Sequence, residues 1–177
     1  MKFIVEPSTL RGKAKIPGSK SNTTRAVVVA TLAEGESIIR NPLPSWDCLS
    51  TVEVYKGYGA EVVSLDKDKW IIHGSSKNPT LPKDVLNTGN SGTTTYMAIA
   101  TASLIGEGYT VITGDHQIRR RPSGPLLEAI KDLGGEAFSV RGNGSQPVVI
   151  RGPISGGKTK LPGINSQWLS PLLINTP

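Results

Sequence analysis

The sequence predicts an α/β fold built from repeated units, each running helix, strand, helix, strand, strand and preceded by a strand. Two stretches of small and apolar residues open with similar hydroxyl-rich starts, at Ser21-Asn22-Thr23-Thr24 and Ser91-Gly92-Thr93-Thr94. Each stretch closes at a glycine, as helices commonly do, and a short β-branched run typical of a strand follows it. A third start, Ser166-Gln167-Trp168-Leu169, lies a similar interval further on. Because such repeats bury their faces only by stacking, we expect related units packed on one another.

We divide the chain into unit one (17–76), unit two (77–152) and the start of unit three (153–177). In each of the first two units a second helical pattern ends at glycine, at Gly57-Tyr58-Gly59 and at Gly134-Gly135. In unit two this pattern can be capped by Ser123, and its leucines and isoleucine fall on one face. Each unit then closes with a predicted hairpin, formed by 61–65 with 70–73 and by 136–140 with 148–151.

Composition narrows the class of function. The 177 residues include 20 Lys and Arg against 14 Asp and Glu, a net charge of +6 that invites anionic partners. Aromatic residues make up only 5% of the chain, which disfavours nucleic-acid binding by base stacking. The longest apolar run is far too short to span a membrane. We therefore expect neither nucleic acid nor membrane as a partner.

Cysteine and histidine are scarce. Cys48 is the single cysteine, which excludes an internal disulfide and a cysteine-cluster zinc site and fits a reducing, cytoplasmic compartment. Two histidines leave little scope for metal binding, so we expect no metal. We interpret Cys48 and the three tryptophans as packing residues and Asp47 and Asp115 as isolated carboxylates; the tryptophans are Trp46, Trp70 and Trp168.

The helix starts are the candidate site. A helix start presents free backbone N–H groups and partial positive charge, which favour anions. Lys20 and Arg25 flank the first start, and Arg121 ends an Arg-Arg-Arg run before the second helix of unit two. Serines and asparagines at such positions are also ordinary helix caps, and arginine runs are also solvated turns. If the units are related by rotation, however, the three starts converge into one pocket for a ligand with several negative groups.

A competing motif lies between Gly152 and Thr159. Its sequence, GPISGGKT, satisfies the nucleotide-binding P-loop pattern and follows a predicted strand. The chemistry of that loop needs a helix that begins at the lysine, whereas proline and glycine follow Lys158 closely. We retain a P-loop nucleotide-binding protein as a remote alternative.

Four ordered motifs resemble the 5-enolpyruvylshikimate-3-phosphate synthase family, the enolpyruvyl transferases of the shikimate pathway. Residues 17–26 (PGSKSNTTRA) are similar to the family signature PGSKSxSxRA, and 89–94 (GNSGTT) to its GNSGTT segment. Residues 121–135 resemble its RPMxPLLxALxxLGA stretch, and 166–168 its SSQF segment. The resemblance covers most of the chain.

The resemblance implies a particular architecture. Family members have two similar domains, each made of three βαβαββ units around a pseudo-threefold axis, an inside-out α/β barrel. The strands expected at 2–5 and 13–16, within residues 1–16, would belong to the other domain, and residues 17–177 to a substrate-binding domain truncated in its third unit. Family chains are more than twice as long, so the second domain, with the acid/base carboxylates, would be missing and the isolated chain inactive.

The resemblance also implies a reaction, 3-phosphoshikimate 1-carboxyvinyl transfer. Family members move the enolpyruvyl group of phosphoenolpyruvate to the 5-hydroxyl of shikimate 3-phosphate through a tetrahedral intermediate, without metal or organic cofactor. By this likeness, Lys20 and Arg121 would act electrostatically in catalysis. Substrate would be bound by Lys20, Ser21, Arg25, Asn90, Gly92, Arg121, Asn165, Ser166 and Gln167. Two polyanionic substrates require such a density of cations and N–H donors.

Three positions depart from the family pattern. Tyr96 stands where an arginine usually follows GNSGTT, Asn165 replaces the first serine of SSQF, and Pro171 lies early in the third helix. These departures leave open a paralogous carboxyvinyltransferase-like protein, or an anion-binding module, that acts on another anionic cyclic alcohol. The related UDP-N-acetylglucosamine enolpyruvyl transferase fits less well, because its reactive loop cysteine has no counterpart between Asp115 and Arg121.

Overall fold

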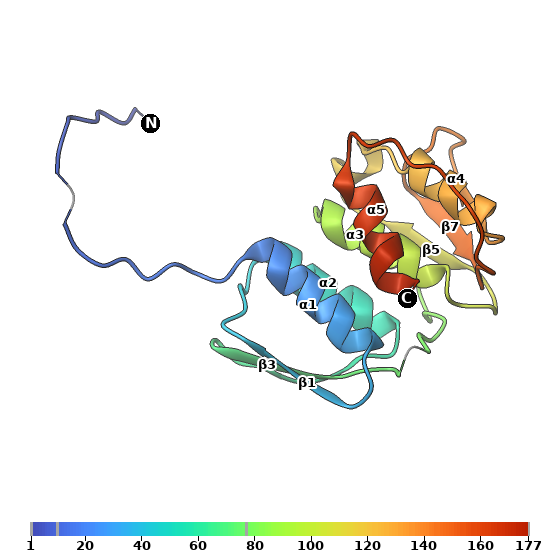
Figure 1. Cartoon of the computed structure of the whole chain (residues 1–177), viewed down its shortest axis with the longest axis horizontal. Coiled ribbons are helices and arrows are strands. Elements are labelled where there is room, and N and C mark those ends of the chain that lie inside the picture. Colours follow the sequence, from blue (N-terminus) through green and yellow to red (C-terminus); the bar gives the residue numbers. More distant parts are fainter. Residues whose placement is uncertain (1, 10, 77, 177) are drawn as a thin grey trace.

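The first repeat forms as predicted in the computed structural model, which describes residues 2–9, 11–76 and 78–176 (Figure 1). Its first hairpin differs from the prediction by one residue, because Lys69 joins the second strand. The elements are α1 (Lys20–Leu32), β1 (Glu36–Arg40), α2 (Trp46–Gly57), β2 (Glu61–Leu65) and β3 (Lys69–His73).

The second repeat has the same order and adds a short leading strand and a 3-10 turn. The predicted hairpin is confirmed, with its first strand one residue shorter than expected. The elements are β4 (Leu86–Asn87), α3 (Gly92–Ala102), β5 (Thr110–Thr113), η1 (Ile118–Arg120), α4 (Gly124–Asp132), β6 (Glu136–Ser139) and β7 (Val148–Arg151); α5 (Ser166–Asn175) then opens the third unit.

The two sheets confirm that the units are repeats. The first sheet has the strand order β1-β3-β2, and the second has β4-β5-β7-β6, so equivalent strands occupy equivalent places. Both hairpins are antiparallel, with Val62 opposite Ile72 in one and Phe138 opposite Val149 in the other. In the second sheet β4 pairs parallel with β5 across α3, which forms a βαβ crossover.

Helix α3 forms the centre of the molecule. Figure 1 shows α3 and α5 between the pair α1–α2 and the sheet that contains β5 and β7, and α3 packs on all of these elements. Every residue of α3 except Thr93 is buried. Small side chains let the neighbouring elements approach, and Tyr58, the residue that follows α2, bonds to the helix: its Oη donates to the Ala98 carbonyl at 2.7 Å. The core is thus shared between units, as stacking repeats require.

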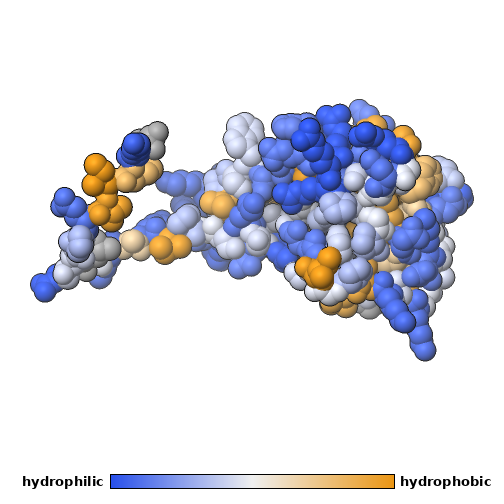
Figure 2. All heavy atoms as spheres, turned by 90° about the horizontal axis from the view of Figure 1, so that it is seen from above, coloured by the Kyte–Doolittle hydropathy of each residue, from blue (hydrophilic) through white to orange (hydrophobic). Residues whose placement is uncertain are grey.

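The N-terminal segment forms no strand on its own in this structure. Residues 2–9 and 11–18 form neither helix nor strand and extend away from the body, with Phe3, Ile4 and Val5 exposed (Figures 1 and 2). A strand forms only where a partner supplies the hydrogen bonds. The assignment of 2–5 and 13–16 to another domain stays a prediction.

Two of the three tryptophans pack as expected. Trp70 and Trp168 are buried, whereas Trp46 is 87% exposed, so its interpretation as a packing residue is wrong. Trp46 is the first residue of α2, where a side chain points past the helix end and away from the core. Cys48, two positions later, is fully buried as predicted.

The third helix tolerates its proline. Pro171 lies inside α5 and is buried, and the helix continues for four further residues to Asn175. Asn175 Nδ2 donates to the Pro171 carbonyl at 2.8 Å, which ties the end of the helix back to its middle. Within the described parts of the chain, no helix combines the length and the apolar character that crossing a membrane requires.

Candidate functional site

The start of α1 places its cations beside the start of α2. Ser19 caps α1 by accepting from the Asn22 N–H. Lys20 Nζ lies 2.7 Å from Asp47 Oδ2, and both side chains remain accessible to solvent. Arg25, one turn along from exposed Ser21, donates from Nη1 to the Ser21 carbonyl at 3.2 Å. Asp47 is therefore not the isolated carboxylate that the sequence suggests.

At the start of α3, the guanidinium of Arg121 lies directly against Gly92. A Cβ atom on Gly92 would stand 2.5 Å from Arg121 Nη1 and 3.3 Å from Cζ, so any larger residue would displace the arginine. Ser91 caps the helix, and Asn90, just before it, is exposed. The turn before α3 is bonded to the loop after β5, because the Asp115 N–H donates to the Gly89 carbonyl at 2.8 Å.

The start of α5 is joined to the start of α3. Gln167 Nε2 donates to Thr93 Oγ1 at 3.0 Å, a contact between the first turn of α5 and the first turn of α3. Asn165 Oδ1 accepts from the Gln167 N–H at 3.0 Å and so acts as the helix cap, while Ser166 is exposed. The carboxamide oxygen of Asn165 is thereby engaged inside the protein, and its Nδ2 group is the part left to face a ligand.

A buried hydroxyl chain links the α2 side of the site to the α3 side. Thr51 Oγ1 lies 2.8 Å from the Asp47 carbonyl and 2.7 Å from Thr94 Oγ1, which in turn lies 2.6 Å from Ser91 Oγ. The structure therefore connects all three predicted starts, α1 through Asp47 and α5 through Gln167. The sequence alone does not reveal Thr51 as the bridge, because no motif marks it.

Two residues near Arg121 were not predicted as part of the site. Tyr96 Oη donates to the Pro122 carbonyl at 3.0 Å. Burial raises the pKa of Tyr96, an effect that the neighbouring Trp168 indole and the Arg121 charge only partly oppose, so the phenol stays protonated. Gln146 is fully buried beneath the same loop. Its signal in the sequence is weak, since a glutamine in a predicted turn is usually solvated.

Ser123 lies at the predicted start of α4 but does not make the predicted capping hydrogen bond. It occupies the cap position of α4, yet its side chain makes no cap hydrogen bond. Its hydroxyl bonds to the side chain of Gln146 at 2.7 Å instead.

The P-loop alternative is wrong. Residues 152–165 contain no helix, so no helix start faces Lys158. Thr159 Oγ1 donates to Asp132 Oδ2 at 2.7 Å, and the segment runs across the outside of α4. Proline and glycine after the lysine prevent the helix that phosphate binding requires.

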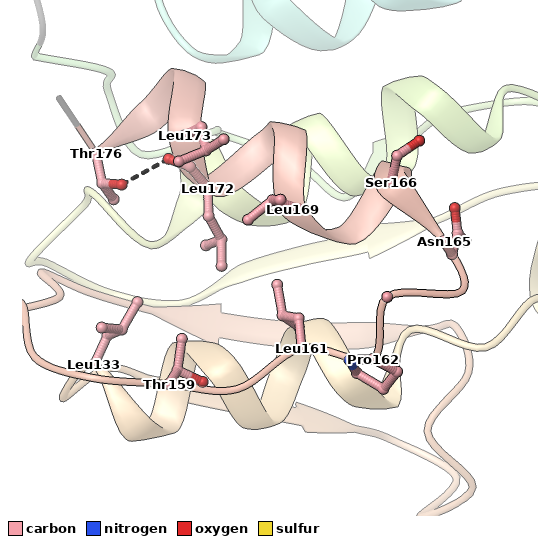
Figure 3. Close-up of a pocket in the computed structure, with 11 residues that line it drawn as sticks. Leu133, Thr159, Leu161, Pro162, Asn165, Ser166, Leu169, Leu172, Leu173 and Thr176 are labelled. Carbon is pink, nitrogen blue, oxygen red and sulfur yellow. Dashed lines mark hydrogen bonds between the residues drawn. The ribbon is translucent and has the colours of Figure 1, made fainter.

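An apolar pocket of about 450 Å³ lies between this segment and α5 (Figure 3). Leu133 and Leu161 face Leu169 and Leu172 across it, and no cation lines it. Asn165 and Ser166 also line this pocket, so it adjoins the predicted binding residues at the start of α5, but its apolar walls offer nothing to a polyanion. Among the described residues, no group of three His, Cys, Asp or Glu side chains could hold a metal ion.

Fold and site together define a class: an α/β repeat protein in which cations gather at linked helix starts. The family model for EPSP synthase (3-phosphoshikimate 1-carboxyvinyltransferase) matches residues 4–177. The chain therefore belongs to the EPSP synthase family.

Individual relatives agree with this assignment. The chain is 53% identical over its full length to 3-phosphoshikimate 1-carboxyvinyltransferase of Acetivibrio thermocellus, and 49% identical over 98% of its length to that of Ruminiclostridium cellulolyticum. A solved structure of EPSP synthase from Acinetobacter baumannii superposes with a TM-score of 0.84 at 26% identity, over 93% of this chain and 37% of the other. The chain spans about 40% of the length of the curated relatives it matches.

Proposed function

We propose that this chain is the substrate-binding portion of a 3-phosphoshikimate 1-carboxyvinyltransferase. Its substrates would be shikimate 3-phosphate and phosphoenolpyruvate, the reaction that the names of its relatives describe. The contact of Arg121 with Gly92 carries the proposal, because it sets a guanidinium beside the free N–H groups of a buried helix start. Such a pairing suits a phosphate or carboxylate group that neither feature would bind firmly alone.

Each element has a role in this proposal. Phosphoenolpyruvate would lie at the start of α3 against Asn90, Gly92 and Arg121. Shikimate 3-phosphate would lie across the starts of α1 and α5. There it would contact Ser21, Arg25, Asn165, Ser166 and Gln167.

Lys20 would serve both substrates. Its ammonium group already has a carboxylate partner in Asp47, so a bound substrate would share or replace that ion pair. Lys20 and Arg121 would then stabilise negative charge as the tetrahedral intermediate forms, since fixed cations act most strongly on charge that develops during the reaction.

The acid/base groups would come from the rest of a full-length protein, together with further cations. We accordingly propose that the chain alone binds its substrates without turning them over. We also propose that it works in the cytoplasm without metal, organic cofactor or nucleic-acid partner. A single cysteine, Cys48, suits a reducing compartment.

Titration calorimetry tests the site assignment. We expect Arg25→Ala to weaken shikimate 3-phosphate binding about tenfold, because a charge-assisted hydrogen bond to phosphate contributes about 1.5 kcal/mol. Arg141→Ala is the matched control, since Arg141 is an exposed arginine in the β6–β7 turn. Equal affinities for wild type and Arg25→Ala would show that the ligand lies elsewhere.

The identity of the acceptor alcohol is the part of the proposal that the departures from the family pattern affect most. Tyr96 places a neutral phenol where the family usually has an arginine, which leaves one positive charge fewer near the site. The same calorimeter can compare shikimate 3-phosphate with unphosphorylated shikimate. Tighter binding of the phosphorylated ligand supports shikimate 3-phosphate as the acceptor. Equal binding supports a paralogous protein that acts on another cyclic alcohol.

A further inference from the structure

Arg121 is held by its backbone rather than by its side chain. The side chain is exposed and makes no hydrogen bond or ion pair with the described residues, although it lies against Gly92. It follows η1, a helix of three residues, and the Arg121 N–H donates to the Ile118 carbonyl at 2.9 Å. Whatever fixes this short turn therefore fixes the point on the backbone from which the Arg121 side chain reaches Gly92.

Gln146 binds the turn from below. Its amide is fully buried, and the orientation that satisfies every partner has its oxygen accepting from Ser123 Oγ at 2.7 Å. Its nitrogen then donates to two carbonyls, that of Ile118 at 2.8 Å and that of Arg121 at 3.1 Å. One side chain thus closes both ends of η1, and a buried amide with all partners satisfied resists movement.

Tyr96 binds the next carbonyl from the side of α3. Tyr96 is buried, and its hydroxyl donates to the Pro122 carbonyl at 3.0 Å. Tyr96 lies four residues after Gly92, so both occupy the same face of one helix. The helix that supports the guanidinium therefore also holds the peptide group that follows Arg121.

We propose that Tyr96 and Gln146 are positioning residues that hold Arg121 over the start of α3 before any ligand arrives. Two consecutive carbonyls, those of Arg121 and Pro122, are bonded from two different elements, which fixes both the place and the rotation of the turn. The N–H donors of α3 and the Arg121 guanidinium then form one rigid receptor for an anionic group. Preorganisation of this kind strengthens binding because less ordering is lost on association.

This proposal rests on the proposed function for its ligand, but part of its test needs no ligand. The variants are Tyr96→Phe, which removes one hydroxyl, and Gln146→Leu, which removes the amide. Tyr55→Phe is the matched control, because it also removes one buried tyrosine hydroxyl. That hydroxyl lies 2.8 Å from Thr101 Oγ1 and makes no hydrogen bond with η1 or Arg121. Arg121→Ala defines the loss when the guanidinium is absent.

Hydrogen exchange measures the positioning directly. We expect the amides of Arg121 and Ser123 to exchange about fivefold faster or more in Tyr96→Phe and Gln146→Leu than in Tyr55→Phe, because one buried hydrogen bond contributes about 1 kcal/mol. If Gln146→Leu does not fold, Tyr96→Phe decides alone. Exchange at these amides equal to that of the control would overturn the proposal.

Calorimetry with phosphoenolpyruvate measures the consequence. We expect Tyr96→Phe and Gln146→Leu to weaken binding by about three- to tenfold, with Tyr55→Phe unchanged and no further loss when either variant is combined with Arg121→Ala. If Arg121→Ala binds as wild type does, the proposed function fails and the exchange result still judges the positioning. If Arg121→Ala weakens binding and the two variants do not, the positioning role is wrong.

Discussion

The ion pair between Lys20 and Asp47 is the clearest charge feature at the scale of single residues. Asp47 lies in the first turn of α2, where its carboxylate also interacts favourably with the helix dipole. It is the one acidic group that touches the predicted binding cations among the described residues. An anionic ligand at the start of α1 meets a site whose positive charge is already partly neutralised.

We expect Asp47→Asn to tighten the binding of inorganic phosphate or phosphoenolpyruvate by about fivefold at low salt, because a unit charge about 4 Å away contributes about 1 kcal/mol in water. The gain should shrink as salt is added, since the groups are accessible to solvent. Glu53→Gln is the control, as it removes one negative charge from an exposed site on the same helix. Phosphate affinity that is unchanged in Asp47→Asn, measured by calorimetry at two salt concentrations, would contradict this view of the ion pair.

The individual helices show which features of the fold the sequence predicts. The starts of α1, α3 and α5 are marked by Ser19, Ser91 and Asn165, and in each the side-chain oxygen accepts a backbone N–H of the first turn. Local chemistry of this kind depends on neighbouring residues only, so the sequence predicts it well. The two hairpins are predictable for the same reason.

Contacts between distant segments are the part that sequence reasoning misses. The contacts of Asp47 with Lys20, and of Gln146 with the Arg121 carbonyl, join residues far apart in the sequence and form only in the folded chain. The strands expected at 2–5 and 13–16 stay a prediction for the same reason, because a strand forms only with a partner that the local sequence does not name. Trp46 shows the converse, a large aromatic residue whose exposure depends on its place at a helix end.

The cap of α5 offers a direct test at the scale of one element. We expect Asn165→Ala to lower the free energy of unfolding by about 1 kcal/mol, because the Gln167 N–H loses its acceptor. Asn165→Ser, which restores the residue typical of the family, should keep most of the stability. Urea unfolding measures the difference, with Asn90→Ala as a control because Ser91 performs the capping there. An Asn165→Ala variant as stable as wild type would show that α5 does not depend on its cap.

Buried tyrosines couple the stability of the whole molecule to pH. Burial raises the pKa of Tyr58 well above its ordinary value of 10.0, with a smaller contribution from Tyr55, whose own pKa burial also raises. Above pH 10 the unfolded chain therefore loses protons that the folded chain keeps. Stability is fully present below that pH and falls as pH rises, by about 1.4 kcal/mol per pH unit for each tyrosine.

We expect urea midpoints to stay level from pH 7 to about pH 9.5 and to fall steeply beyond it. Tyr58→Phe should be less stable at pH 7 by about 1 kcal/mol, because its bond to the Ala98 carbonyl is lost, but should show a shallower alkaline decline. Tyr109→Phe, at a half-exposed position, provides the control. Parallel curves for wild type and Tyr58→Phe would show that this phenol does not set the alkaline limit.

The enclosure of α3 limits how this molecule can diversify. Its first turn would supply N–H groups to the proposed site, yet nearly every side chain behind that turn packs among three other helices and two strands. Substitutions within α3 disturb both halves of the core at once, so new ligand preferences cannot readily arise there. They are accessible instead at the open first turns of α1 and α5, which makes positions such as Ser21 and Ser166 the natural targets for an evolving or engineered change of specificity.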